Sequence, residues 1–346
     1  MDFHHRGEPT QGRRFRTGLP SGTDGHIPAR TMTFTNDAKA VIALTTRLGT
    51  RDRPSLGPAA WHSLASNLSD RDLTPSAVFD RSFDAADFSG TDPTLTDRLE
   101  VLLGDAPAAL LEADELVQKG VWILTAADDD YPEQLRLRLD SNAPPVLFGV
   151  GEQALLDGTG VGIVGSRDVS VEGAGVAKDV ARRAASLART VVSGGAKGVD
   201  QLAMNSAFGS GGRVLGVLAD SLETRIRRPE ILGALDNGRV CLVTQQLPSA
   251  GFSPAAAMGR NKLIYGLSTV TVIVASDLES GGTWAGATEA LRTGNGVVAV
   301  WRGEGEGPGN QELQRRGAHP LTAPDELEEL FRIEVDASLE QLTLLD

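Results

Sequence analysis

Six short apolar runs dominate the hydrophobic pattern of the second half of the chain. Hardly one of them alternates polar and apolar positions, and helix-patterned segments separate most of them. Strands that are buried on both faces of a parallel sheet have this pattern. The pattern therefore predicts an α/β fold with a doubly wound parallel sheet. The predicted strands lie at residues 161–165, 190–193, 214–218, 240–243, 270–275 and 296–300.

The flanking segments have other patterns. From Asn36 onward apolar residues recur at spacings of three and four, which predicts short amphipathic helices up to Lys119. Two further strands are predicted at residues 121–124 and 146–149. We therefore expect four parts, with Met32 as a candidate start of the protein. These are a disordered tail over 1–31, a small helical domain over 36–120, a Rossmann-like domain over 121–320, and an acidic helix (325–332) and tail over 321–346.

The net charge of −13 is unevenly distributed. Residues 32–159 hold 10 Lys and Arg against 21 Asp and Glu, whereas residues 160–320 hold 17 against 14. The predicted sheet region is thus slightly basic and can accommodate a polyanion. Cys241 is the only cysteine, and no apolar run approaches a membrane span. We expect a cytoplasmic protein with no disulfide and no membrane contact.

Glycine-rich turns follow several predicted strands, where ligands of open parallel sheets bind. At a helix start, free backbone amides and the helix dipole favour an anion. Lysine, arginine and hydroxyl side chains accompany these turns, and Arg260-Asn261-Lys262 is predicted to open a helix before strand 270–275. Alternatively, these are only the tight turns that any α/β domain needs. The candidate phosphate-binding residues are Gly165, Ser166, Arg167, Ser193, Gly194, Lys197, Gly198, Arg260, Asn261, Lys262, Ser280, Gly281 and Thr283.

Two familiar nucleotide motifs are not expected to operate. Gly160, Gly162 and Gly165 have the spacing of a dinucleotide fingerprint, but the first two precede or lie inside the strand. The turn at 193–200 lacks the spacing of a P-loop, and we interpret Asp200 as a residue that complements a helix dipole. No Cys and His spacing suits zinc. We expect no metal, no cofactor and no catalytic residue.

Residues 122–319 resemble the DNA-processing protein A (DprA/Smf) family. The matching motifs are Asp130-Tyr131-Pro132, Pro144-Pro145-Val146-Leu147-Phe148, Gly162–Arg167, Ser193–Asp200, Gly259–Ser268, Ser280–Thr283 and Gly317-Ala318. The resemblance implies an extended Rossmann fold that binds single-stranded DNA in a basic pocket. It also implies homodimers that help load the recombinase RecA, in natural transformation and related DNA processing, without a known catalytic step. The implied DNA contacts are Gly165, Ser166, Arg167, Lys197, Arg260, Asn261 and Lys262.

This chain departs from the family pattern in three places. It has Leu222–Pro229 where a Tyr-Pro is usual, and Thr244–Pro248 where Ser-Glu-Tyr-Pro is common. An acidic tail stands in place of a winged-helix domain. We therefore expect a divergent member.

Two other functions compete with DNA binding. Gly281–Gly286 and Glu289 partly match nucleoside-monophosphate phosphoribohydrolases of the lysine-decarboxylase-like group, although Trp284 replaces a turn glycine. A sensor domain for a small nucleotide is the third interpretation. Aromatic residues make up only 5% of the chain, with Phe208, Phe252, Tyr265, Trp284 and Trp301 nearest the turns. DNA would therefore be held mainly through phosphates and amides, with single bases in small pockets.

Overall fold

The computed structural model describes residues 33–50, 54–88 and 94–333. The predicted tail over 1–31, the candidate start at Met32 and the end of the acidic tail lie outside these ranges.

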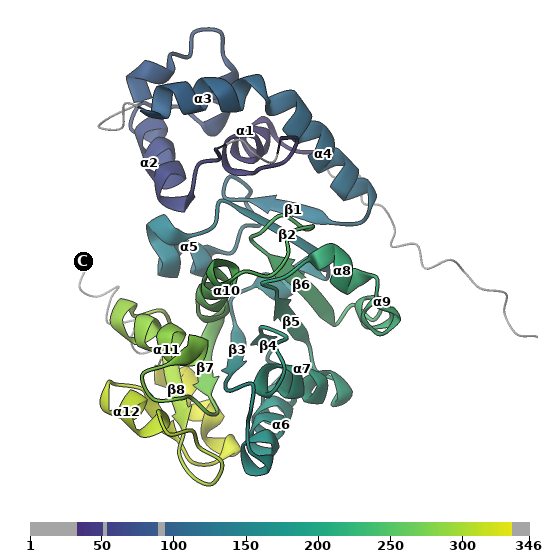
Figure 1. Ribbon diagram of the computed structural model, residues 1–346, viewed down its shortest axis with the longest axis vertical. Helices are drawn as coiled ribbons and strands as arrows, with labels where there is room; N and C mark the ends of the chain where they lie inside the picture. The colour runs from purple at the N-terminus through teal and green to yellow at the C-terminus, as the bar shows by residue number, and fades with distance from the viewer. Residues whose placement is uncertain (1–32, 51–53, 89–93, 334–346) are drawn as a thin grey trace, which may run out of the picture.

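A nine-stranded sheet forms the centre of the molecule (Figure 1), in the order β1-β2-β6-β5-β4-β3-β7-β8-β9. All pairings from β6 to β9 are parallel, while β2 pairs antiparallel with both β1 and β6. The predicted α/β fold is confirmed, with a mixed edge. The predicted strands are all present, and a short ninth strand extends the sheet. The strands are β1 (Trp122–Thr125), β2 (Val146–Gly151), β3 (Gly160–Val164), β4 (Val191–Ser193), β5 (Val214–Val217), β6 (Val240–Thr244), β7 (Ser268–Ile273), β8 (Val297–Trp301) and β9 (His319–Leu321).

Helices cover both faces of the sheet, because successive strand residues point to opposite sides. Val191 and Val192 of β4, for example, belong to two different apolar clusters. The first cluster takes in α6 (Val171–Ser186), α7 (Val199–Gly209), α8 (Leu222–Ile226), α9 (Pro229–Leu235) and the helix at 327–333. The second takes in α5 (Glu133–Leu139), α10 (Pro254–Gly266), α11 (Gly281–Thr293) and α12 (Asn310–Arg315). This two-sided covering makes the sheet doubly wound.

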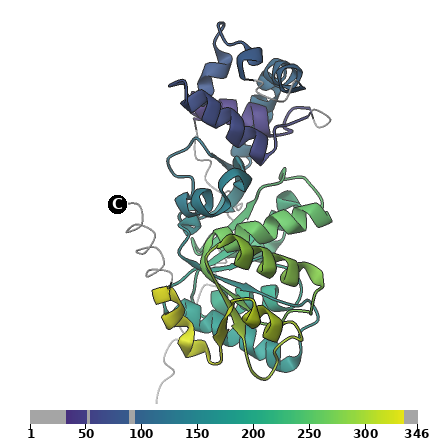
Figure 2. The same ribbon diagram turned by 90° about the vertical axis from the view of Figure 1, so that its left-hand side faces the viewer.

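The N-terminal helices lie beyond the β1–β2 edge of the sheet (Figures 1 and 2). They are α1 (Asn36–Thr45), α2 (Pro58–Ser69), α3 (Thr94–Gly104) and α4 (Ala106–Gln118), with 3-10 turns at Pro75–Phe79 and Ala85–Phe88. The segment predicted as a helix at Leu73–Phe79 is one of these turns.

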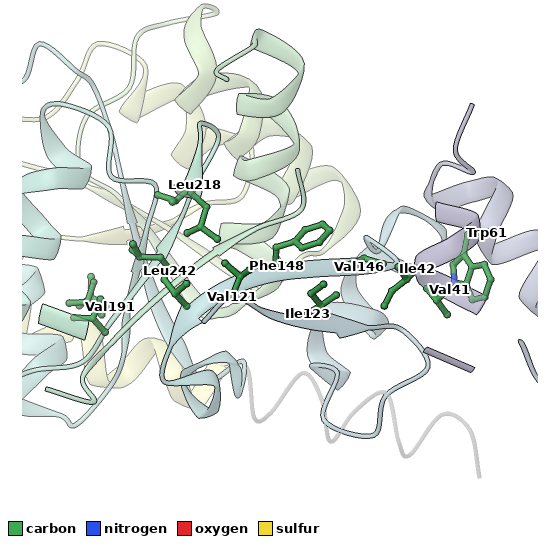
Figure 3. Close-up of a cluster of buried hydrophobic side chains, with 14 of the residues drawn as sticks. Val41, Ile42, Trp61, Val121, Ile123, Val146, Phe148, Val191, Leu218 and Leu242 are labelled. Atoms are coloured by element: carbon green, nitrogen blue, oxygen red, sulfur yellow. The ribbon is translucent and has the colours of Figure 1, made fainter. Parts of the chain in front are cut away.

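Apolar packing continues from these helices into the sheet. Figure 3 shows Ile42 of α1 beside Val146 of β2, followed along the sheet by Phe148 of β2 and then by Leu242 of β6. Helix α1 contacts both β1 and β2. One buried cluster therefore joins the N-terminal helices to the sheet. Within the described residues, no helix combines the length and the apolar character needed to cross a bilayer.

Candidate functional site

A pocket of about 430 Å³ lies at the carboxyl ends of β3 and β7, which we call the edge pocket. Four segments line it: the turn after β3, the turn after β4 with the first turn of α7, one side of α10, and the turn that leads from β7 into α11. It contains eight of the thirteen predicted residues. These are Gly165, Ser166, Arg167, Arg260, Asn261, Ser280, Gly281 and Thr283.

A buried ion pair lies beneath the pocket. Asp200, in the first turn of α7, accepts a hydrogen bond of 3.0 Å from Nη1 of Arg260 on α10. Burial raises the pKa of the Asp200 carboxyl, while Arg260 and the backbone amides of Gly194 and Gly165 favour its charged form. Asp200 therefore does more than complement a helix dipole, because it holds three segments of the pocket together.

Two buried donors in the pocket lack a partner within the described residues. They are Nε of Arg260 and the hydroxyl of Tyr265, and both side chains line the pocket. Burial and the neighbouring Asp200 charge raise the pKa of Tyr265, so its hydroxyl stays protonated. A buried donor without a partner costs free energy unless a ligand or water accepts from it. Arg260 and Tyr265 thus bring unused hydrogen-bond donors close to the pocket.

Backbone amides contribute less at the β3 turn than predicted. The Ser166 amide donates to the carbonyl of Ala275 at 2.9 Å, and the Gly165 amide donates a hydrogen bond to the Asp200 carboxylate. Helix α6 begins only at Val171, and the Ser170 hydroxyl already accepts from its first turn. These groups are therefore not free to bind an anion.

The start of α11 is the better anion site. Ser280, Gly281, Gly282 and Thr283 all line the pocket, and the Ser280 side chain does not cap the helix. The first amides of a helix have no partner within the helix, and the helix dipole adds positive potential there. Asn261 donates to the carbonyl of Gly282 at 3.0 Å and thereby fixes this turn to α10.

Arg167 supplies the available positive charge. It is exposed, lines the pocket, and forms no ion pair with any residue that the structure describes. Asp168, Asp200 and Asp277 also line the pocket, so the lining carries no excess of positive charge. We therefore expect ligand binding here to depend on hydrogen bonds and on Arg167 rather than on a strong positive field.

The other five predicted residues lie outside the lining. Ser193 is buried and donates to the carbonyl of Ile163, and Lys262 is 3.0 Å from Oε1 of Glu289. Lys197 is exposed, with its ammonium 3.9 Å from Asp168, so it lies close to the pocket without lining it.

The two glycines among these five have packing roles. A Cβ at Gly194 would overlap the guanidinium of Arg260, and one at Gly198 would overlap the carbonyl oxygen of Ser166. Gly198 also has a φ of +89°, which favours glycine. These two positions allow the β3 turn, the β4 turn and α10 to approach one another.

The prediction that Arg260-Asn261-Lys262 opens a helix is wrong. Helix α10 begins at Pro254, after Ser253, whose hydroxyl accepts from the Ala256 amide. The Ser-Pro pair is a strong helix start that the prediction overlooked. The three residues lie inside the helix, so only their side chains are available, and Arg260 and Lys262 point to different partners.

Glu289, the residue on which the hydrolase alternative depended, is not in the edge pocket. Its carboxylate pairs with Lys262, and it lines a separate hollow together with Trp284 and Arg316. Within the described residues, no three His, Cys, Asp or Glu side chains are grouped as a metal would require.

Together the fold and the pocket define a Rossmann-like α/β protein with a polar pocket at the carboxyl edge of its sheet. A family model described as DNA recombination-mediator protein A matches residues 122–332, which is more than half of the chain. The protein belongs to this family.

Similar proteins bear the DprA and Smf names. The chain is 30% identical to the DNA processing protein DprA of Bacillus subtilis over 186 residues, covering 53% of this chain and 61% of that protein. It is 31% identical to the protein Smf of Escherichia coli over 221 residues, covering 61% and 57%. The chain thus spans about three fifths of the length of these relatives.

Two solved structures share the fold. DNA processing protein A of Streptococcus pneumoniae superposes with a TM-score of 0.65 at 21% identity, covering 86% of this chain and 98% of that one. DNA processing protein A of Helicobacter pylori, whose structure was described for its single-stranded DNA binding mode, gives a TM-score of 0.51 at 23% identity. That match covers 62% of this chain and 96% of the other.

Proposed function

We propose that this protein binds single-stranded DNA in the edge pocket and acts as a DNA-processing protein in recombination or DNA uptake. The observation that carries the proposal is the placement of Arg167. Arg167 lines the pocket, its guanidinium has no carboxylate partner among the described residues, and the uncapped start of α11 lines the same pocket. Such a pair of groups can hold a phosphate between a charged fork and backbone amides.

The size of the pocket favours a single strand. A volume of about 430 Å³ suits one nucleotide unit and is too small for a duplex. Arg260 and Tyr265 line the pocket, and their donors that are unpaired within the described residues would donate to the acceptors of an unstacked base, which only a single strand offers. Family membership and the DNA-binding relative from H. pylori support the same ligand.

The proposal has further parts that follow from the family resemblance. The protein would act in the cytoplasm as a homodimer and would help load a RecA-type recombinase onto the bound strand. It would do so without catalysing a reaction, in keeping with the position of Glu289 outside the edge pocket.

Binding of labelled oligonucleotides tests the central part. We expect a single-stranded oligonucleotide to bind more tightly than a duplex of the same sequence, and nucleoside monophosphates to compete weakly and to stay intact. Tight binding or hydrolysis of a mononucleotide, with no affinity for oligonucleotides, would contradict the proposal and favour the hydrolase or sensor alternatives.

A further inference from the structure

A second pocket lies where the N-terminal helices meet the sheet, and we call it the junction pocket. It has a volume of about 440 Å³. Its described walls come from residues 45–47 and 55–58, from the two prolines before β2 with the start of that strand, and from the loop after β6. Because β2 pairs antiparallel with β6, with Phe148 opposite Thr244, the start of β2 lies beside the end of β6. The junction pocket therefore opens at the same edge of the sheet as the edge pocket.

The lining of the junction pocket is unusual for this region of the chain. Among the described residues that line it there is no Asp or Glu, although residues 32–159 hold 21 acidic against 10 basic residues. Arg47 lines it, is exposed, and has no ion-pair partner among the described residues. Among the described residues of this pocket, no carboxylate therefore opposes the charge of Arg47.

The remaining lining groups fit a nucleobase. Leu56, Pro58 and Leu247 contribute apolar side chains to the lining. The carboxamides of Gln245 and Gln246 are half-buried, and neither makes a side-chain hydrogen bond with a described residue. A carboxamide can both donate and accept, as the edges of every base require. Apolar walls with a few converging polar groups are typical of small-ligand sites, which occur preferentially between domains.

We propose that the junction pocket holds a second nucleotide of the same single strand, with the base against Gln245 and Gln246 and the phosphate near Arg47. This inference rests on the proposed function, because it extends the DNA path from the edge pocket. The ligand class is single-stranded nucleic acid, recognised through one base and one phosphate.

Helix α10 lines the edge pocket and also contacts a side chain of the junction pocket. Ala257, Arg260 and Asn261 face the edge pocket, while Gly259 packs against the side chain of Gln245. Strand β6 is three positions from β3 in the sheet, which corresponds to about 14 Å at ordinary strand spacing. A few nucleotides of extended single-stranded DNA span this distance. Phe252, which is 58% exposed, lies in the chain between Ala250 of the junction pocket and Ala257, and offers a face to an intervening base.

If one DNA strand contacts both pockets, its affinity for the protein depends on its length. A dinucleotide can occupy only one pocket, whereas a strand of about ten nucleotides can occupy both. Once the first nucleotide is bound, the second binds at a high effective concentration. We expect the longer oligothymidylate to bind at least about tenfold more tightly than the dinucleotide.

Substitutions at Arg47 and Gln246 provide the test, measured by fluorescence anisotropy with thymidine dinucleotide and with an oligothymidylate of about ten nucleotides. Arg47→Ala and Gln246→Ala should each remove most of the length advantage and leave the affinity for the dinucleotide unchanged. Arg81→Ala is the matched control, since Arg81 is an exposed arginine of the same helical region outside the junction pocket. It should retain the full length advantage. Melting temperatures equal to that of the wild type would verify that the variants are folded.

Three results would count against the inference. Equal affinity of the wild type for both lengths would overturn it and leave the edge pocket as the single DNA site. The same conclusion follows if Arg47→Ala and Gln246→Ala bind both lengths as the wild type does, or weaken both equally. If the wild type binds neither oligonucleotide, the proposed function fails, and the second site fails with it.

Discussion

The buried pair of Asp200 and Arg260 allows the structural and binding roles of one residue to be separated. Nη1 of Arg260 and Oδ2 of Asp200 are 3.0 Å apart, and the two side chains are only 10% and 6% exposed. Removal of one partner leaves a buried charge without compensation, which costs about 3–5 kcal/mol. Arg260→Met or Asp200→Leu alone should therefore lower the free energy of unfolding by about this amount. The double variant should recover most of the loss, because it buries two apolar side chains and no charge.

Urea unfolding followed by circular dichroism would measure all four proteins and yield the coupling energy of the pair. The folded double variant should still bind single-stranded DNA more weakly than the wild type, since it lacks the guanidinium donors of Arg260, a residue that lines the edge pocket. If Arg260→Met alone is as stable as the wild type, the description of a buried, coupled pair is wrong. If the double variant binds DNA normally, Arg260 supports the pocket without contacting the ligand.

Three further predictions concern pH, catalysis and metals. Burial raises the pKa of Asp37, but hydrogen bonds from Ser76 and Thr74 outweigh it, and the net pKa is lowered. Asp37→Asn should therefore lower the free energy of unfolding by about 1 kcal/mol at neutral pH. The difference from the wild type should disappear as the pH falls below about 4, and a pH-independent difference would refute this assignment. Glu289→Gln should leave DNA affinity unchanged, because Glu289 lies outside the edge pocket; a loss above about threefold, roughly 0.6 kcal/mol, would implicate it. EDTA should not alter DNA binding, and loss of binding that one divalent ion restores would reveal a metal site.

Much of the fold could be predicted because its signals are local. The parallel strands are continuous apolar runs, and Ser170 is a strong helix cap, so both follow from adjacent residues. Because ligands of open parallel sheets bind at the carboxyl edge, the turns at 165–167 and 280–283 could be chosen as candidates. In the structure these two turns line one pocket.

The parts that the prediction missed depend on residues far apart in the chain. The pairing of Asp200 with Arg260 joins residues 60 positions apart, and Tyr265 lines the pocket as a donor rather than as a stacking ring. The hydrogen bond from the Ser166 amide to the Ala275 carbonyl likewise depends on the position of the neighbouring strand, which the local sequence does not specify. One local signal was available, since Asn261 and Tyr265 are four residues apart and lie on one face of a helix.

The central claim is that Arg167 binds the phosphate of single-stranded DNA, and a salt titration of Arg167→Ala tests it most directly. Substitution should weaken binding by about 1–3 kcal/mol, the scale of a lost charge-assisted hydrogen bond. It should also reduce the slope of log affinity against log salt by about 0.7, as expected for one phosphate contact on a single strand.

Arg182→Ala is the matched control, because Arg182 is an exposed arginine of α6 that pairs with Asp179. Arg183 is less suitable, since it pairs with Asp325 and Glu328 near the C-terminal helix. The account predicts a lower affinity and a shallower slope for Arg167→Ala alone, with an unchanged melting temperature. An affinity and a salt slope equal to those of Arg182→Ala would contradict it.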